Sequence, residues 1–225
     1  MGKNMKRCIL VGGTGGLGSS IQKGLASHYI FEERYLSEHR PDVMDPRAYD
    51  DLSGTIDLAI YIAGINLVKP ITEISHAELQ NIFNVNILGA FNFVSNVKKN
   101  LIDGRNPTFI FASSIMAGHP YPYRTAYASS KAAIEGLTRA VAVEFGEDGI
   151  AAVCLRLGHL SSLMKSTPPN TELLEKVKQH TPKKTLVSSE KVASSIIHIH
   201  ECSDIYNGQV IDMDCGYTLN RWPIR

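Results

Sequence analysis

Short apolar runs alternate with amphipathic stretches along this chain, and that alternation limits the possible folds more than any other feature. The runs are mostly rich in Ile, Val, Leu or Phe and are bounded by turn residues, as expected of strands buried on both faces. The helical patterns between them predict crossover units and a doubly wound α/β fold, a parallel sheet with helices on both faces. The predicted strands are Cys8–Val11, Arg34–Leu36, Leu58–Ala63, Thr108–Ala112, Ala151–Leu157 and Gln209–Met213.

The intervening stretches predict five helices and one shortened crossover. The segment Phe31–Asp57 has room for a further short strand at Asp42–Met44 but hardly for a full helix, so we expect a loop there. No repeat, low-complexity tract or linker composition divides the 225 residues, and we expect one domain over residues 1–225. The predicted helices are Gly18–Ser27, Ser75–Lys98, Ala126–Phe145, Thr171–Gln179 and Ser189–His200.

Charge and cysteine content exclude several classes of partner. Lys and Arg total 23 against 22 for Asp and Glu, which argues against binding to nucleic acid or an anionic membrane. No stretch approaches the roughly 18 apolar residues of a membrane span, and we expect a cytoplasmic enzyme. The scattered cysteines lack the spacing of zinc or redox sites, so no metal is expected; they are Cys8, Cys154, Cys202 and Cys215.

A glycine-rich turn follows the first predicted strand and opens the first helix. Glycines allow a tight turn, close approach of a pyrophosphate and close packing of helix on strand, while the helix N-terminus offers free amides and a positive dipole end. This arrangement predicts a Rossmann-like dinucleotide site. Its candidate residues are Gly12, Thr14, Gly16, Leu17 and Gly18.

Tyr127 and Lys131 lie four residues apart in a predicted helix, so their side chains project from one face. A cation within reach can lower the pKa of a phenol from about 10 by roughly one to three units, into the range of proton transfer. Ser114 lies thirteen residues earlier at the end of a predicted strand, where open parallel sheets place ligands; Ser113 is the neighbouring alternative. Asn86 stands in a helical pattern where asparagine is not favoured by propensity; such a residue is usually a surface asparagine unless a water or a kink recruits it.

Together these motifs resemble the short-chain dehydrogenase/reductase family, over nearly the whole chain. The resemblance implies an NAD(P)-dependent oxidoreductase with a catalytic tetrad of Asn86, Ser114, Tyr127 and Lys131. Hydride would pass between the nicotinamide and a secondary alcohol or ketone while Tyr127 exchanges a proton with the oxygen. The lysine would also bind the nicotinamide ribose, and the asparagine would help to hold a water.

The resemblance also implies further cofactor contacts. They are Asp42 and Val43 at the adenine, Ala63 and Gly64 beside the sheet, and Gly158 and Leu160 near the nicotinamide. Departures from the family pattern are Val11 for threonine, Tyr61-Ile62 for paired asparagines and Leu157 for proline. None of them removes a group that handles protons or hydride.

The choice between NAD and NADP falls to the end of the second strand. Glu38 lies about twenty residues after Gly18, where a carboxylate accepts hydrogen bonds from the adenosine ribose and repels a 2′-phosphate. Gly15 stands where NADP-preferring relatives often carry a basic residue. Both observations favour NAD, whereas His39 and Arg40 could clamp a phosphate.

The substrate class and the assembly stay open at this point. A lysine-rich segment, Ser161–Lys184, would either recruit an anionic substrate or form a solvated helix face. The alternatives are a 3-oxoacyl-(carrier protein) reductase that uses NADPH and a non-catalytic cofactor sensor. The resemblance implies a homodimer or homotetramer.

Overall fold

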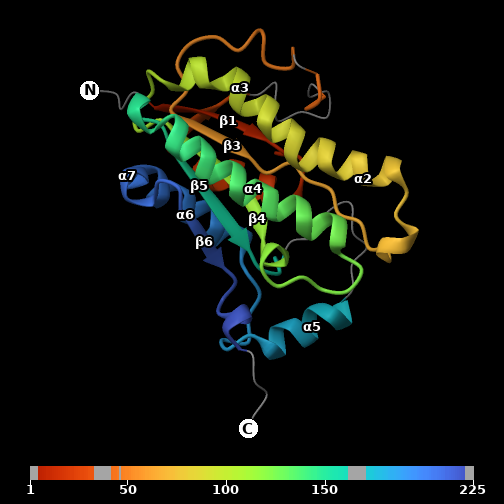
Figure 1. Cartoon of the computed structure of the whole chain (residues 1–225). Coiled ribbons are helices and arrows are strands. Elements are labelled where there is room, and N and C mark those ends of the chain that lie inside the picture. Colours follow the sequence, from red (N-terminus) through yellow and green to blue (C-terminus); the bar gives the residue numbers. More distant parts are fainter. Residues whose placement is uncertain (1–4, 33–41, 46, 162–170, 221–225) are drawn as a thin grey trace.

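The computed structural model describes residues 5–32, 42–45, 47–161 and 171–220 of the chain. These residues form a six-stranded parallel sheet in the order β2-β1-β3-β4-β5-β6 (Figure 1). The doubly wound α/β prediction is therefore confirmed. The strands are β1 (Lys6–Val11), β2 (Tyr29–Phe31), β3 (Leu58–Tyr61), β4 (Thr108–Ser114), β5 (Ala151–Leu157) and β6 (Val210–Met213).

The register of the central strands aligns their ends at one edge of the sheet. Val11 pairs with Tyr61, and Tyr61 pairs with Phe111. β4 and β5 continue three residues further and end together at the pair Ser114 and Leu157. The segments that follow β1, β3, β4 and β5 are thus brought to the same edge, which is where such sheets bind ligands.

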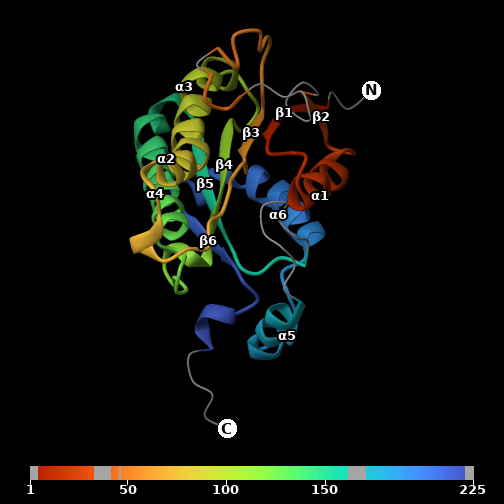
Figure 2. The same ribbon diagram turned by 90° about the vertical axis from the view of Figure 1, so that its right-hand side faces the viewer.

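Helices cover both faces of the sheet. Figure 2 shows α2, α3 and α4 on one side and α1 and α6 on the other, and each side encloses its own buried apolar cluster. The first cluster contains Phe93 and Phe109, and the second contains Ile21 and Ile196. The helices are α1 (Gly16–Leu25), α2 (His76–Phe83), α3 (Gly89–Leu101), α4 (Thr125–Glu144), α5 (Thr171–His180), α6 (Ser189–Glu201) and α7 (Ser203–Tyr206).

The predicted helix Ser75–Lys98 is divided into two. Ser75 caps α2 through a capping box with Glu78, which explains why the helix begins there. A π-helical turn, Asn84–Leu88, then separates α2 from α3. Such turns often mark functional sites, and this one holds Asn86.

The segment between β2 and β3 was predicted to contain two short strands. The strand predicted at Asp42–Met44 is wrong: the Asp42 carboxylate accepts a hydrogen bond from the Met44 amide at 2.9 Å, and this local bond forms a turn. The strand predicted at Arg34–Leu36 lies outside the described residues, and β2 runs beside β1 at Tyr29–Phe31 instead. The described residues 42–45 and 47–57 form turns and no helix, as the compact spacing predicted.

Two elements extend beyond the carboxyl edge of the sheet. They are α5 and the short 3-10 turn Tyr217–Leu219, which lie beyond the ends of β4, β5 and β6 in Figure 1. Within the described part of the chain, no helix combines the length and the apolar character needed to cross a bilayer.

A buried histidine on α6 forms hydrogen bonds at the edge of the sheet where the strands begin. The Nε2 atom of His200 lies 3.0 Å from the Asn106 carbonyl oxygen, which can only accept, so Nε2 carries the proton and donates it. Nδ1 therefore accepts from the Tyr29 hydroxyl at 2.5 Å. Burial and the positive charge of Lys6 lower the pKa of His200 to about 4, so the folded protein holds this ring neutral.

Stability should consequently fall on acidification. Because the pKa of His200 is lower in the folded state than its ordinary value of about 6.5, protons bind preferentially to the unfolded chain as the pH falls from about 6.5 to about 4. We expect a loss of about 3 kcal/mol of unfolding free energy across this window, measured by urea denaturation at pH 7, 5.5 and 4. The variant His200→Gln should show a flatter dependence, and an identical slope in both proteins would contradict the assignment.

Candidate active site

The site begins where β1 ends, at the point where the strand order reverses. β1 lies between β2 and β3, so the connections that leave these strands diverge and open a crevice at the carboxyl edge. The glycine turn after Val11 enters this crevice and leads into α1.

The glycines of this turn have no room for side chains. Gly12 has a φ of +100°, and a Cβ there would lie 2.6 Å from the Ala63 amide nitrogen. A Cβ on Gly18 would lie 2.4 Å from the Gly12 carbonyl oxygen. Gly15 is the N-cap of α1, and no side chain caps the helix. The turn therefore offers an uncapped helix N-terminus and close backbone approach, which fit the pyrophosphate of a dinucleotide.

The segment after β3 joins the glycine turn to the predicted tetrad. The amides of Ile62 and Ala63 donate to the Val11 carbonyl at 2.9 and 3.1 Å. A Cβ on Gly64 would lie 3.2 Å from Lys131 Nζ and 3.3 Å from Asn86 Oδ1. Gly64 thus lies against two of the four tetrad residues.

Asn86 is fully buried on the π-helical turn, and its side chain bonds to protein groups. Oδ1 accepts from the Ile65 amide at 2.8 Å, while Nδ2 donates to the Ile65 carbonyl at 3.0 Å and to Ser130 Oγ at 2.9 Å. The amide therefore links the segment after β3 to α4. The structure thus brings Asn86 and Lys131, two residues of the predicted tetrad, to the same side of Gly64 and places Asn86 on a π-helical turn.

Lys131 is buried on α4, with 5% of its surface exposed. Its Nζ donates to the Ala112 carbonyl at 2.8 Å, near the end of β4, and lies 5.8 Å from the centroid of the Tyr127 ring. Burial lowers the pKa of Lys131 to about 8, so most molecules keep the charge at neutral pH.

The two neighbouring serines have different surroundings. Ser113 is buried and donates to the Lys131 carbonyl at 3.1 Å and to Glu135 Oε1 at 2.9 Å, which packs it against α4. Ser114 ends β4, is partly exposed, accepts from the Met116 amide at 3.2 Å, and is near enough to Tyr127 to lower the pKa of its phenol. The geometry therefore favours Ser114 over Ser113 as the hydroxyl that meets a ligand.

The pKa of the Tyr127 phenol differs from the one expected from the sequence. Burial raises its pKa above 10, and the hydrogen bond from Ser114 and the charge of Arg124 offset only part of this effect. The prediction that the lysine lowers this pKa is not supported, because the charge that acts on the phenol is Arg124. At neutral pH the phenol keeps its proton.

Arg124 is a residue that the sequence reasoning missed. It precedes α4 as its N-cap, three residues before Tyr127, and is partly buried. Its charge acts on Tyr127 and also lowers the pKa of His159. Its position three residues before Tyr127 could have identified it from the sequence, because residues three apart in a helix lie on one face.

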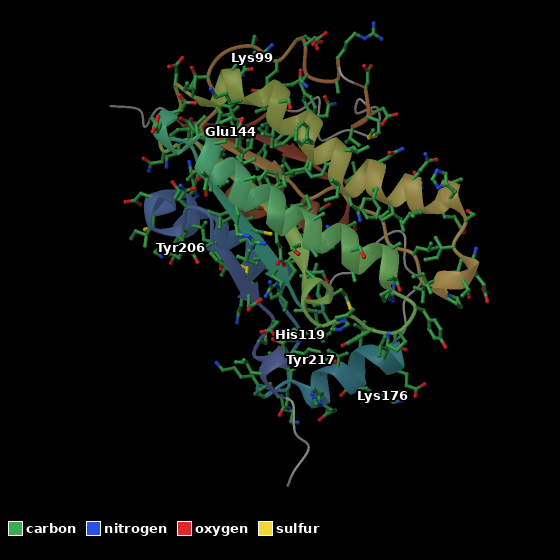
Figure 3. All side chains as sticks on the ribbon, in the orientation of Figure 1. Lys99, His119, Glu144, Lys176, Tyr206 and Tyr217 are labelled. Atoms are coloured by element: carbon green, nitrogen blue, oxygen red, sulfur yellow. The ribbon has the colours of Figure 1, made fainter. Side chains whose placement is uncertain are left out.

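Aromatic side chains from four segments pack together beside this edge, forming an aromatic wall of Tyr121, His159, His180 and Tyr217. The Tyr121 hydroxyl hydrogen-bonds to the Tyr217 hydroxyl and lies 3.1 Å from His159 Nε2. The His159 and His180 rings contact Tyr217 edge-on, with centroids 5.5 and 5.3 Å away. Figure 3 labels Tyr217 and His119 at this end of the molecule, with Lys176 further out on α5.

The other residues predicted to contact the cofactor lie at the same edge of the sheet, except those outside the described part of the chain. Asp42 acts electrostatically on Tyr61 at the end of β3, and Val43 packs against Gly89. The Gly158 amide donates to the Met213 carbonyl at 2.9 Å, and Leu160 forms an isolated bridge with Val187. Glu38, with His39 and Arg40, lies outside the described residues. Thr14, Gly16 and Leu17 are partly buried in the glycine turn and the start of α1.

The lysines of α5 are largely neutralised by their neighbours. Lys176 pairs with Glu172 at 2.6 Å, and Lys178 pairs with Glu175 at 3.7 Å. These exposed i,i+4 and i,i+3 pairs favour the solvated helix face over the basic lid. Lys165 lies outside the described residues.

The sequence is similar to one family model and to several characterised reductases. The family model described as "Enoyl-(Acyl carrier protein) reductase" matches residues 46–218. The carbonyl reductase [NADPH] 2 of Sus scrofa is 29% identical over 167 residues, which cover 73% of this chain and 68% of that protein. A 3-oxoacyl-[acyl-carrier-protein] reductase of Thermotoga maritima is 28% identical over 171 residues, which cover 74% of this chain and 68% of that protein.

Comparison with solved structures supports the fold. A 3-ketoacyl-(acyl-carrier-protein) reductase from Brucella melitensis, solved in complex with NADH, superposes with a TM-score of 0.82. The alignment covers 95% of this chain and 98% of that one, at 18% identity. At this identity the likeness concerns the fold alone.

Two glycine variants distinguish the effect of a side chain that clashes with the backbone from the effect of replacing a glycine as such. In Gly18→Ala the new Cβ meets backbone atoms, so we expect about 2 kcal/mol lower unfolding free energy and about tenfold weaker NADH binding. Gly15→Ala is the matched control, because its Cβ would meet only the Gly12 oxygen at 3.9 Å. Urea denaturation and NADH fluorescence titration measure both effects, and equal losses in the two variants would contradict this picture of the turn.

Proposed function

Because the chain belongs to the short-chain dehydrogenase/reductase family, we propose that its oxidoreductase chemistry takes place at the carboxyl-edge site. The reaction is hydride transfer between a nicotinamide cofactor and a secondary alcohol or ketone. The observation that carries the proposal is the grouping around Tyr127, where the strand-end Ser114 acts on the pKa of the phenol and the buried ammonium of Lys131 lies 5.8 Å from the centre of the ring.

Tyr127 and Ser114 handle the substrate oxygen. Bound in the crevice, the nicotinamide supplies or accepts the hydride. Tyr127 keeps its proton at neutral pH because burial raises its pKa, so it is set to donate a proton to a ketone oxygen. Ser114 donates a hydrogen bond to the same oxygen and stabilises the charge that develops there, a role worth a few kcal/mol in a preorganised site.

Lys131 and Asn86 hold the site together around the cofactor. Lys131 Nζ lies near Gly64 and donates to the Ala112 carbonyl, and its remaining protons point to a role in binding the nicotinamide ribose. Both N–H donors of the Asn86 amide bond to Ile65 and Ser130. Asn86 therefore acts as a positioning residue, with spare acceptor capacity at Oδ1 for a water.

The preferred cofactor is NAD. Gly15 provides no basic side chain near the turn, and Glu38 stands at the sequence distance of a ribose-binding carboxylate. Among the relatives, the pig protein is named for NADPH and the Brucella structure contains NADH, so the family resemblance permits either.

Steady-state kinetics will decide the cofactor. We expect a lower KM for NADH than for NADPH, and the variant Glu38→Gln should narrow the difference by about tenfold because it removes the charge that repels a 2′-phosphate. A tenfold preference of the unaltered enzyme for NADPH would overturn the assignment of NAD.

A second candidate function is reduction of a 3-oxoacyl group on a carrier protein. The names of the Thermotoga and Brucella relatives favour it. A mostly apolar cleft of about 500 Å³ beside the start of α4, lined by residues that include Met116, Pro122 and Ala128, offers space for an acyl chain. The paired lysines of α5 argue against a basic docking surface there.

Self-association and a cytoplasmic location complete the proposal. Apolar side chains are exposed on the outer helices, including Phe91 at 60% and Val143 at 84%, and a second copy could cover this surface. All four cysteines are free thiols, which suits a reducing compartment.

The decisive variant is Tyr127→Phe, which removes only the hydroxyl. We expect turnover to fall by about a thousandfold or more while NADH binding changes less than about twofold, because the ring still packs on α4. Tyr206→Phe is the control, since this tyrosine packs against His198 away from the site. Turnover is followed by NADH absorbance with a panel of ketones, and an active Tyr127→Phe enzyme would refute the role of the phenol.

A further inference from the structure

The Arg124 side chain carries a charge that no described residue pairs with. The structure shows no side-chain hydrogen bond or ion pair between it and the described residues, and its Nη1 atom is buried without a hydrogen-bond partner among them. The undescribed residues 162–170 contain no Asp or Glu. Although the residue is only partly buried, an Nη1 atom that contacts neither water nor a protein acceptor costs free energy, and a bound anion would offset that cost.

The position of this side chain relates it to the reacting oxygen. Arg124 is the residue directly before α4, and Tyr127 lies three residues later in the first turn of that helix. The Arg124 charge acts on Tyr127 and on His159 of the aromatic wall. The guanidinium is therefore within electrostatic reach of both the phenol and the wall, close enough to meet a charged group on a substrate whose carbonyl is at Tyr127.

We infer that Arg124 binds the carboxylate of the substrate, which makes the substrate class small oxo or hydroxy acids. The inference rests on the proposed function, because it places the carbonyl of the same molecule at Tyr127. A planar guanidinium matches a carboxylate through two parallel hydrogen bonds. The short separation along α4 suits an acid whose carboxylate and carbonyl are one to three bonds apart.

Neighbouring groups support an anion over a cation or an apolar group. Burial and, after it, the charge of Arg124 lower the pKa of His159, which favours a neutral ring that offers hydrogen bonds without a competing charge. Tyr121 and Tyr217 add hydroxyls to the same wall. No acidic side chain takes part in the described contacts of the wall.

The test compares oxo acids with their methyl esters, which keep the carbonyl but remove the charge. The probes are pyruvate, acetoacetate and levulinate, each with its ester, bound to the NADH-loaded protein and followed by calorimetry and by turnover. We expect at least one acid to be preferred over its ester, and Arg124→Gln to reduce that preference by about ten- to a hundredfold. Arg124→Lys should keep part of it, and the exposed Arg139→Gln on the same helix should change nothing.

Stability separates ligand binding from a structural role. Removing an unpartnered buried charge should leave the melting temperature of Arg124→Gln equal to or above that of the unaltered protein. A fall of more than about 4 °C would show that Arg124 supports the fold and would overturn the inference. Failure of all three acids to be preferred, or an acid-to-ester ratio unchanged in Arg124→Gln, would overturn it as well.

The two proposals fail in different ways. If ester turnover depends on Tyr127 but acids gain nothing from Arg124, the proposed function stands and the substrate class is wrong. If acids bind through Arg124 while Tyr127→Phe remains fully active, the carboxylate site stands and the role of the phenol is wrong.

Discussion

The site depends on the way α4 is fixed to the ends of β4 and β5 by buried polar contacts. Lys131 Nζ donates to the Ala112 carbonyl, and Ser113 donates to both Lys131 and Glu135. Glu135 in turn forms two hydrogen bonds with Arg156 on β5, at 2.8 and 2.7 Å. Apolar packing would allow a helix to slide on a sheet, whereas these contacts set one register. That register brings Tyr127 to Ser114.

Because buried polar groups are normally paired, an unpaired cationic group beside the site is informative. The polar atoms of Lys131, Ser113 and Asn86 have partners within the described structure, so these residues organise the site. Arg124 differs, since its buried Nη1 has no partner among the described residues. The same rule that explains the rigid part of the site therefore identifies the part that is open to a ligand.

The sequence predicted the features that follow from periodicity and spacing. Buried strands and amphipathic helices determine the sheet, and the spacing of Tyr127 and Lys131 places both on one face of α4. Features set by local hydrogen bonds or by tertiary packing were not predictable. Asp42 forms a turn through its own carboxylate, and the π-helical turn at Asn86 depends on contacts with Ile65 and Ser130, which are distant in sequence. The partner of Ser113 also comes from the tertiary structure.

The electrostatics of Tyr127 show why spacing alone was misleading. Lys131 lies close to the ring, but its Nζ is directed to a carbonyl and burial lowers its own pKa, whereas the Arg124 guanidinium stays charged at any physiological pH. The charge that favours ionisation of the phenol is thus on the side where we place the substrate carboxylate. A bound carboxylate would offset that charge, so the phenol would hold its proton more firmly once an acid substrate is in place. Proton transfer would then wait for negative charge to develop on the substrate oxygen, which couples the acid step of the reaction to the presence of the correct substrate.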